Sequence, residues 1–131
     1  MSPAVMFLCV HNAGRSQMAA AFMRQLAGDD VVVYSAGSAP GETLNPAVVE
    51  AMLEVGLDIR DQKPTRLTNE MAQAADVIVT MGCGDACPVY LGKTYLDWEL
   101  TDPAGKTVNE VRAIRDDIKT RVEELLVTLR S

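Results

Sequence analysis

The sequence has no long hydrophobic segment and no block of basic residues. Its apolar runs, such as Ala4 to Val10, are far shorter than the roughly 20 residues of a membrane-spanning helix, and no basic segment precedes that run. We therefore expect a cytoplasmic protein with no membrane contact. The formal net charge of −6 argues against a nucleic-acid partner, because such binding requires a basic surface. A local pocket for a small anion is compatible with this charge.

Cysteine and histidine are also scarce. The three cysteines are an odd number, which does not suit a secreted disulfide scaffold. In a cytoplasmic chain they indicate redox chemistry, catalysis or metal binding. The rest of the composition is ordinary, because 131 residues with 48% apolar and 23% charged side chains predict one globular domain over residues 1–131.

The hydrophobic pattern predicts strands that alternate with helices. Residues 4–10 are apolar without alternation, which is typical of a strand buried on both faces of a parallel sheet. The order of elements predicts a three-layer α/β/α fold with a central four-stranded parallel sheet. We predict further strands at 31–34 and 76–81, a short extended piece at 95–98, and helices at 15–27, between Asn45 and Gly56, from Thr68 to Ala75, and from about Thr107 onward.

The loop from Cys9 to Ser16 joins the first strand to the first helix, at the sheet edge where ligands of such folds collect. Its backbone N–H groups and the helix dipole converge on an anion. We expect Cys9 to be a thiolate nucleophile, Arg15 to hold two oxygens of an oxyanion, Ser16 to donate to the thiolate, and Asn12 to shape the loop. The alternative is a buried thiol beside a surface arginine. The predicted substrate-binding residues are Val10, His11, Asn12, Ala13, Gly14, Arg15 and Ser16.

Three motifs together resemble a known family. Cys-x5-Arg-Ser follows the first strand, Ser35-Ala36-Gly37 follows the second, and Asp102-Pro103 precedes the last helix. This arrangement resembles the low-molecular-weight tyrosine phosphatase fold over nearly the whole chain. The resemblance implies a supporting role for Ser35. Of the two branches of this fold, one dephosphorylates phosphotyrosine, and the other consists of thioredoxin-coupled arsenate reductases with two additional redox cysteines.

Two cysteines, Cys83 and Cys87, lie four residues apart in a glycine-containing segment after the third predicted strand. This spacing permits a disulfide after modest rearrangement. The resemblance implies that Cys9 attacks arsenate, that Cys83 attacks the resulting adduct and releases arsenite, and that Cys87 takes over the disulfide. Thioredoxin is one expected electron donor. An external thiol such as mycothiol, with a mycoredoxin-type partner, is the other.

The segment that begins at Asp102 resembles the reductase version of the general-acid loop, in which Asp102 protonates the leaving oxygen. A plainer alternative is that Asp102 starts a turn and caps the last helix. No aromatic residue occurs between Ser35 and Val89 to form a wall against a phosphotyrosine ring. We therefore predict an arsenate reductase. The alternative is a tyrosine phosphatase of the same fold whose extra cysteines protect Cys9 by reversible oxidation.

One departure from the family concerns a cation site. Some family reductases bind potassium behind the loop through an acidic residue, but Ala20 stands at that position and Lys63 falls where another ligand would be. We expect the Lys63 ammonium to replace the ion, with a solvated lysine as the alternative.

A zinc site is a further interpretation, with Cys9, His11, Cys83 and Cys87 as ligands. The spacing of the last two is unusual for zinc, and Arg15 would lie beside a cation. We therefore expect no metal and no other cofactor.

Overall fold

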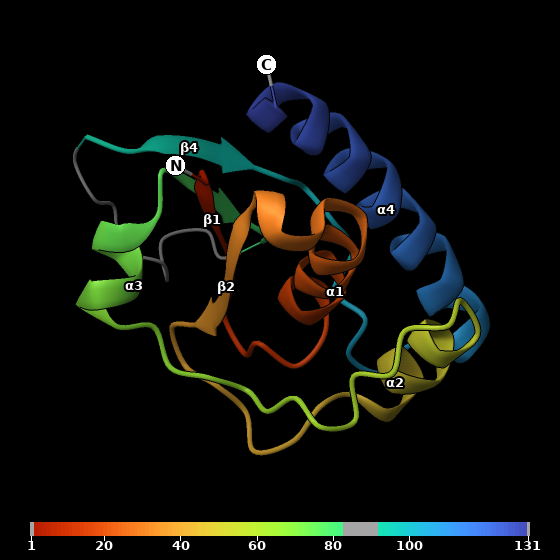
Figure 1. Cartoon of the computed structure of the whole chain (residues 1–131). Helices are drawn as coiled ribbons and strands as arrows, with labels where there is room; N and C mark the ends of the chain where they lie inside the picture. The colour runs from red at the N-terminus through yellow and green to blue at the C-terminus, as the bar shows by residue number, and fades with distance from the viewer. Residues whose placement is uncertain (1, 83–91, 131) are drawn as a thin grey trace.

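In the computed structural model, which describes residues 2–82 and 92–130, four parallel strands form a central sheet (Figure 1). β1 lies inside the sheet, and all six of its residues are buried. This burial on both faces explains the apolar sequence without alternation. The strands, in their order across the sheet, are β2 (Val32–Gly37), β1 (Ala4–Cys9), β3 (Val77–Thr80) and β4 (Thr94–Asp97).

Helices cover both faces of this sheet (Figure 1). One core cluster joins α1, α2 and α4 to alternate residues of β1, such as Val5 and Phe7. The other joins Met6 and Leu8 to residues in and beside α3. The predicted three-layer fold is therefore confirmed. The helices are α1 (Arg15–Ala27), the 3-10 turn η1 (Gly28–Asp30), α2 (Pro46–Leu53), α3 (Asn69–Ala74) and α4 (Val108–Arg130).

The largest error in the predicted boundaries concerns β2. The sequence predicted a strand over 31–34, but β2 continues to Gly37. The reason is tertiary, because β1 pairs with β2 in register as far as Cys9 with Gly37. This pairing outweighs the low strand propensity of the small residues. A Cβ on Gly37 would lie within 3.0 Å of the Val10 carbonyl oxygen, so the close approach requires glycine there.

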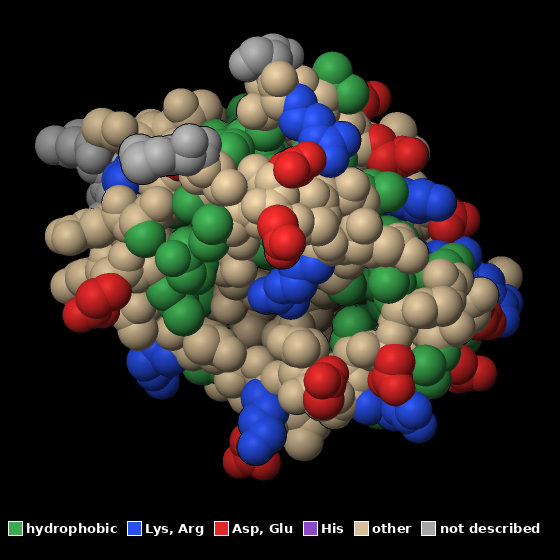
Figure 2. Space-filling model, in the orientation of Figure 1, with side chains coloured by type: hydrophobic (Ala, Val, Ile, Leu, Met, Phe, Trp, Pro, Cys, Tyr) green, Lys and Arg blue, Asp and Glu red, His purple; other side chains and the backbone are tan. Residues whose placement is uncertain are grey.

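The distribution of charged side chains on the surface agrees with the formal net charge of −6, which predicts no extended basic area. On the face shown in Figure 2, basic and acidic side chains are interspersed without a continuous basic area. α4 is 23 residues long but carries charged residues along its length. Within residues 2–82 and 92–130, no helix is long and apolar enough to cross a membrane.

Candidate active site

The Cys9 thiol lies at the carboxyl end of β1, and the residue is only 3% exposed. Its Sγ is 2.8 Å from Ser16 Oγ and accepts a hydrogen bond from the Asn12 amide at 3.2 Å. Ser16 Oγ also accepts from Asn12 Nδ2 at 2.6 Å, and its single hydroxyl proton can donate to the sulfur when Cys9 is a thiolate. The Asn12 amide and the Ser16 hydroxyl thus both contact the Cys9 sulfur.

Asn12 holds the loop together from within. It is fully buried and has a φ of 52°, in the left-handed region that asparagine tolerates better than most residues. Its Nδ2 donates to Ser16 Oγ and to Ser35 Oγ at 2.7 Å, while its Oδ1 accepts from the Thr65 amide at 2.8 Å and from Gln17 Nε2 at 3.0 Å. All four hydrogen-bonding positions of the side chain are used. Ser35 contacts the loop through Asn12, and its supporting role stays a prediction.

Gln17 is a residue that the sequence reasoning missed. It is 2% exposed, and its Nε2 contacts three oxygens: the carbonyl and Oδ1 of Asn12, and the carbonyl of Lys63 at 3.2 Å. Lys63 thus meets the loop through its backbone, and the residue as a whole is exposed. The predicted role of the Lys63 ammonium stays a prediction. The signal that could have identified Gln17 is a polar residue among the buried residues of α1.

The outer part of the loop is tied down through its carbonyls. Val10 and His11 accept from the amides of Ala39 and Gly41, each at 2.9 Å. The His11 ring lies at the pocket and its Nδ1 is 3.2 Å from the Ala39 carbonyl, which can only accept, so Nδ1 carries the proton. Among the described residues, none accepts a hydrogen bond from the amides of His11, Ala13 and Gly14. These amides stay available for an anion.

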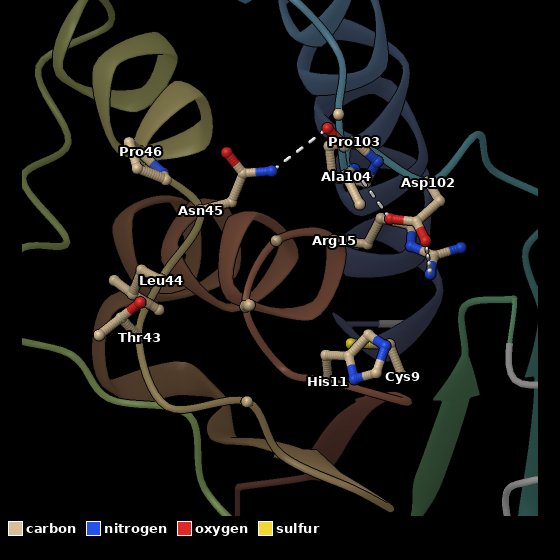
Figure 3. A pocket seen from close by; sticks show the side chains of 14 residues that line it. Cys9, His11, Arg15, Thr43, Leu44, Asn45, Pro46, Asp102, Pro103 and Ala104 are labelled. Atoms are coloured by element: carbon tan, nitrogen blue, oxygen red, sulfur yellow. Dashed lines mark hydrogen bonds and ion pairs between the residues drawn. The ribbon is translucent and has the colours of Figure 1, made fainter.

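Arg15 begins α1 and extends over the site. Its side chain is 9% exposed, its Nη1 donates to the Leu100 carbonyl at 3.3 Å, and its Nη2 lies 3.8 Å from Asp102 Oδ2. Figure 3 shows Arg15 and Asp102 directed toward one another. The guanidinium is therefore held at the pocket by groups from the segment before α4.

Asp102 starts a turn, as the plainer prediction had it, but it does not cap α4. Its Oδ1 accepts from the Ala104 amide at 3.0 Å, and its side chain is 54% exposed. The cap of α4 is Thr107, whose Oγ1 accepts from the Glu110 amide. The carboxyl group of Asp102 therefore remains at the pocket that it lines.

A pocket of about 410 Å³ opens over the loop. Its two sides are joined by a hydrogen bond from Asn45 Nδ2 to the Pro103 carbonyl at 3.2 Å (Figure 3). The Pro103 ring also packs on Gly14, where a Cβ would lie within 3.0 Å of it. None of the described residues that line the pocket is Phe, Tyr or Trp. They are Cys9, His11, Ala13, Gly14, Arg15, Gly41, Thr43, Leu44, Asn45, Pro46, Asp102, Pro103, Ala104 and Gly105.

The predicted relay cysteines, Cys83 and Cys87, lie outside the described residues. Two of the four ligands of the zinc interpretation therefore have no described position. In the part of the chain that the structure describes, no group of three or more His, Cys, Asp or Glu side chains could hold a metal ion.

Comparison with known families settles the relationship of the chain. The family model "Low molecular weight phosphotyrosine protein phosphatase" matches residues 4–131. The chain belongs to this family. The match includes both the Cys9 loop and the Asp102 segment, and the resemblance inferred from the sequence is confirmed.

Relatives within this phosphatase family carry a different activity in their names. A putative arsenate reductase of Halobacterium salinarum is 38% identical over 128 residues, which cover 91% of this chain and 87% of that protein. Arsenate reductase 1 of Staphylococcus epidermidis is 41% identical over 125 residues, 91% of this chain and 92% of that one. A solved thioredoxin-dependent arsenate reductase of Corynebacterium glutamicum superposes with a TM-score of 0.83 at 44% identity. The superposition covers 98% of this chain but 62% of the other.

Proposed function

We propose that this member of the phosphatase family is an arsenate reductase in which Cys9 is the nucleophile. The observation that carries the proposal is the Cys9 thiol, which the Asn12 amide and the Ser16 hydroxyl contact at a pocket that Arg15 also lines. A tetrahedral oxyanion fits the loop amides and the guanidinium. The described residues that line the pocket include no Phe, Tyr or Trp, which favours a small anion over an aryl ester. The names of relatives at 38–41% identity support the same activity.

The first step forms a bond from the Cys9 sulfur to arsenic. One arsenic–oxygen bond breaks, and the oxygen leaves as water after it takes a proton from Asp102. Arg15 and the amides of Ala13 and Gly14 bind the remaining oxygens, whose negative charge they stabilise. The exposed carboxyl group of Asp102, which faces the pocket, supports the assignment of the acid.

The second step moves two electrons to arsenic. A thiolate, which we assign to Cys83, attacks the Cys9 sulfur, and the sulfur–arsenic bond breaks with its electron pair left on arsenic. Arsenite is released and a Cys9–Cys83 disulfide forms. Cys87 then attacks Cys83, which frees Cys9 and leaves a Cys83–Cys87 disulfide for an external reductant.

A single turnover tests this scheme. The protein is mixed with arsenate and no reductant, and thiols are then mapped by mass spectrometry in the wild type and in Cys9→Ser, Cys83→Ser and Cys87→Ser. We expect one arsenite per chain and a new Cys83–Cys87 bond in the wild type, and no arsenite from Cys9→Ser. Asp102→Asn should slow arsenite formation by roughly 10²- to 10⁴-fold. Hydrolysis of aryl phosphates without any arsenite would instead assign the chain to the phosphatase branch.

The proposal also includes the identity of the electron donor. We assign it to a protein dithiol of the thioredoxin class, since the named Corynebacterium relative is thioredoxin-dependent. If Cys83→Ser and Cys87→Ser both turn over normally with mycothiol and a mycoredoxin-type protein, the electron donor is that external thiol system and not thioredoxin. A reducing compartment keeps such thiols available, so we place the enzyme in the cytoplasm.

A further inference from the structure

Gly82 lies at the rim of the sheet, two residues after β3. The preceding residue, Met81, is still attached to β1, because its amide donates to the Leu8 carbonyl at 2.9 Å. Gly82 itself has a φ of +81°, which L residues rarely adopt. The hydrogen bonding between β1 and Met81 therefore fixes the backbone next to this glycine.

The Arg15 guanidinium lies against Gly82. A Cβ built on Gly82 would come within 3.0 Å of Arg15 Nη1, to 3.2 Å from Cζ and to 3.7 Å from Nη2. The Leu100 carbonyl and Asp102 hold the guanidinium through its other contacts. A side chain at position 82 would thus occupy the volume that the guanidinium fills.

This crowding would act on the anion site more than on the core. The group that a new Cβ meets is the far end of a long, flexible side chain. The backbone at position 82 is held next to the strand pairing of β3 with β1. The guanidinium would therefore move, and the sheet would stay in place.

We infer that Gly82 is a positioning residue for the oxyanion site, because its missing side chain fixes where the Arg15 guanidinium stands. This inference rests on the proposed function, in which Arg15 binds arsenate. Gly82 does not touch the anion and acts only through Arg15.

Gly82→Ala is the test, and Gly56→Ala is the matched control. Gly56 has a φ of +79° and is exposed, and a Cβ there would meet no atom within 4 Å. Both variants carry the same backbone strain, and only Gly82→Ala crowds Arg15. The Kd of inorganic phosphate, measured by calorimetry, should rise about tenfold or more in Gly82→Ala and change less than about twofold in Gly56→Ala.

A second measurement separates Arg15 from general disorder. Cys9 is alkylated with anionic iodoacetate and with neutral iodoacetamide, and its peptide is quantified by mass spectrometry. A positioned guanidinium favours the anionic reagent, so the ratio of the two rates should fall in Gly82→Ala toward its value in Arg15→Ala. A general loosening of the loop would change both rates alike and leave the ratio as in the wild type, and that result would overturn the inference.

A double variant covers the possibility that Gly82→Ala does not fold. Lysine lacks the broad guanidinium, so Gly82→Ala in the Arg15→Lys background should change the Kd of phosphate less than about twofold. If the double variant folds and Gly82→Ala does not, that result supports the crowding of Arg15 by the new Cβ. Failure of both to fold, or an equal loss of affinity in both backgrounds, would overturn it.

The two proposals fail in different ways. If Arg15→Ala weakens phosphate binding and Gly82→Ala does not, the inference about Gly82 is wrong and the proposed function stands. If Arg15→Ala leaves the affinity unchanged, the anion-binding role of Arg15 is wrong and the inference falls with it.

Discussion

The loop from Cys9 to Ser16 and the junction between α2 and α4 are both held by polar side chains, but their surroundings differ. In the loop, the fully buried Asn12 uses every hydrogen-bonding position of its side chain. At the junction, Glu54 is partly exposed and binds Arg112 at 2.6 Å and Arg115 at 3.0 Å. The loop is fixed by neutral groups out of water, and the junction by charged groups of which Glu54 and Arg112 are partly exposed to water.

The two regions should therefore respond differently to substitution. Loss of a partner in the loop leaves buried polar atoms unsatisfied and displaces groups that face the substrate. Loss of a partner at the junction changes only how firmly α2 is held on α4. Variants of the loop should lose activity beyond their loss of stability, and variants of the junction should lose stability alone.

Asn12→Ala should have the largest effect. It removes the partners of Ser16, Ser35, Gln17 and the Thr65 amide, so we expect a loss of about 3 kcal/mol in the free energy of unfolding. The rate of arsenate reduction should fall by roughly 10²-fold. Urea titration and steady-state assays measure the two effects. Asn12→Gly is the control, since it tolerates the positive φ, and an active Asn12→Gly would show that only the backbone matters.

Arg115→Met tests the junction at its buried end. Arg115 is 8% exposed, and its Nη1 donates to the Ala51 carbonyl at 2.8 Å. We expect a loss of about 2 kcal/mol by urea titration, with kcat unchanged. Arg121→Met, which removes a more exposed arginine of the same helix, should cost less. A large fall in kcat for Arg115→Met would contradict the contrast between the regions.

Gln17→Leu should cost about 1 kcal/mol, since it removes one amide from three oxygens of the loop and of Lys63. It should also raise the KM for arsenate, because the loop loses its tie to the 63–65 segment. Gln25→Leu makes the same change at an exposed position of α1 and should alter neither quantity. Equal KM values for the two variants would show that Gln17 does not contribute to substrate binding.

Glu54→Gln should have the smallest effect and a distinctive pH dependence. The hydrogen bond from Arg112, followed by that from Arg115, lowers the pKa of Glu54 from 4.5 to about 2. A carboxylate with a lowered pKa stabilises the fold above its unfolded pKa and loses this contribution as the pH falls. The Tm difference between wild type and variant should be present above pH 4.5 and vanish toward pH 2. A difference that does not depend on pH would exclude the ion pairs as its source.

Most of the fold could be predicted because its signals are local. α1 spans the residues that its apolar spacing and the following glycine indicated, and α2 begins where Asn45 and Pro46 predicted. β2 was the exception, since its last three residues are strand only because β1 lies beside them. Pairing between strands distant in sequence overrides weak local propensity.

The site divides in the same way. The sequence by itself determined that Cys9, Arg15 and Ser16 lie in one short loop between a strand and a helix, an arrangement that predicts a common anion site. Only the tertiary structure decided what holds them: Gln17 and the Lys63 carbonyl behind the loop, and Gly82 and Leu100 around Arg15. Those contacts join segments 46 to 85 residues apart, and no local pattern records which atoms such segments bring together.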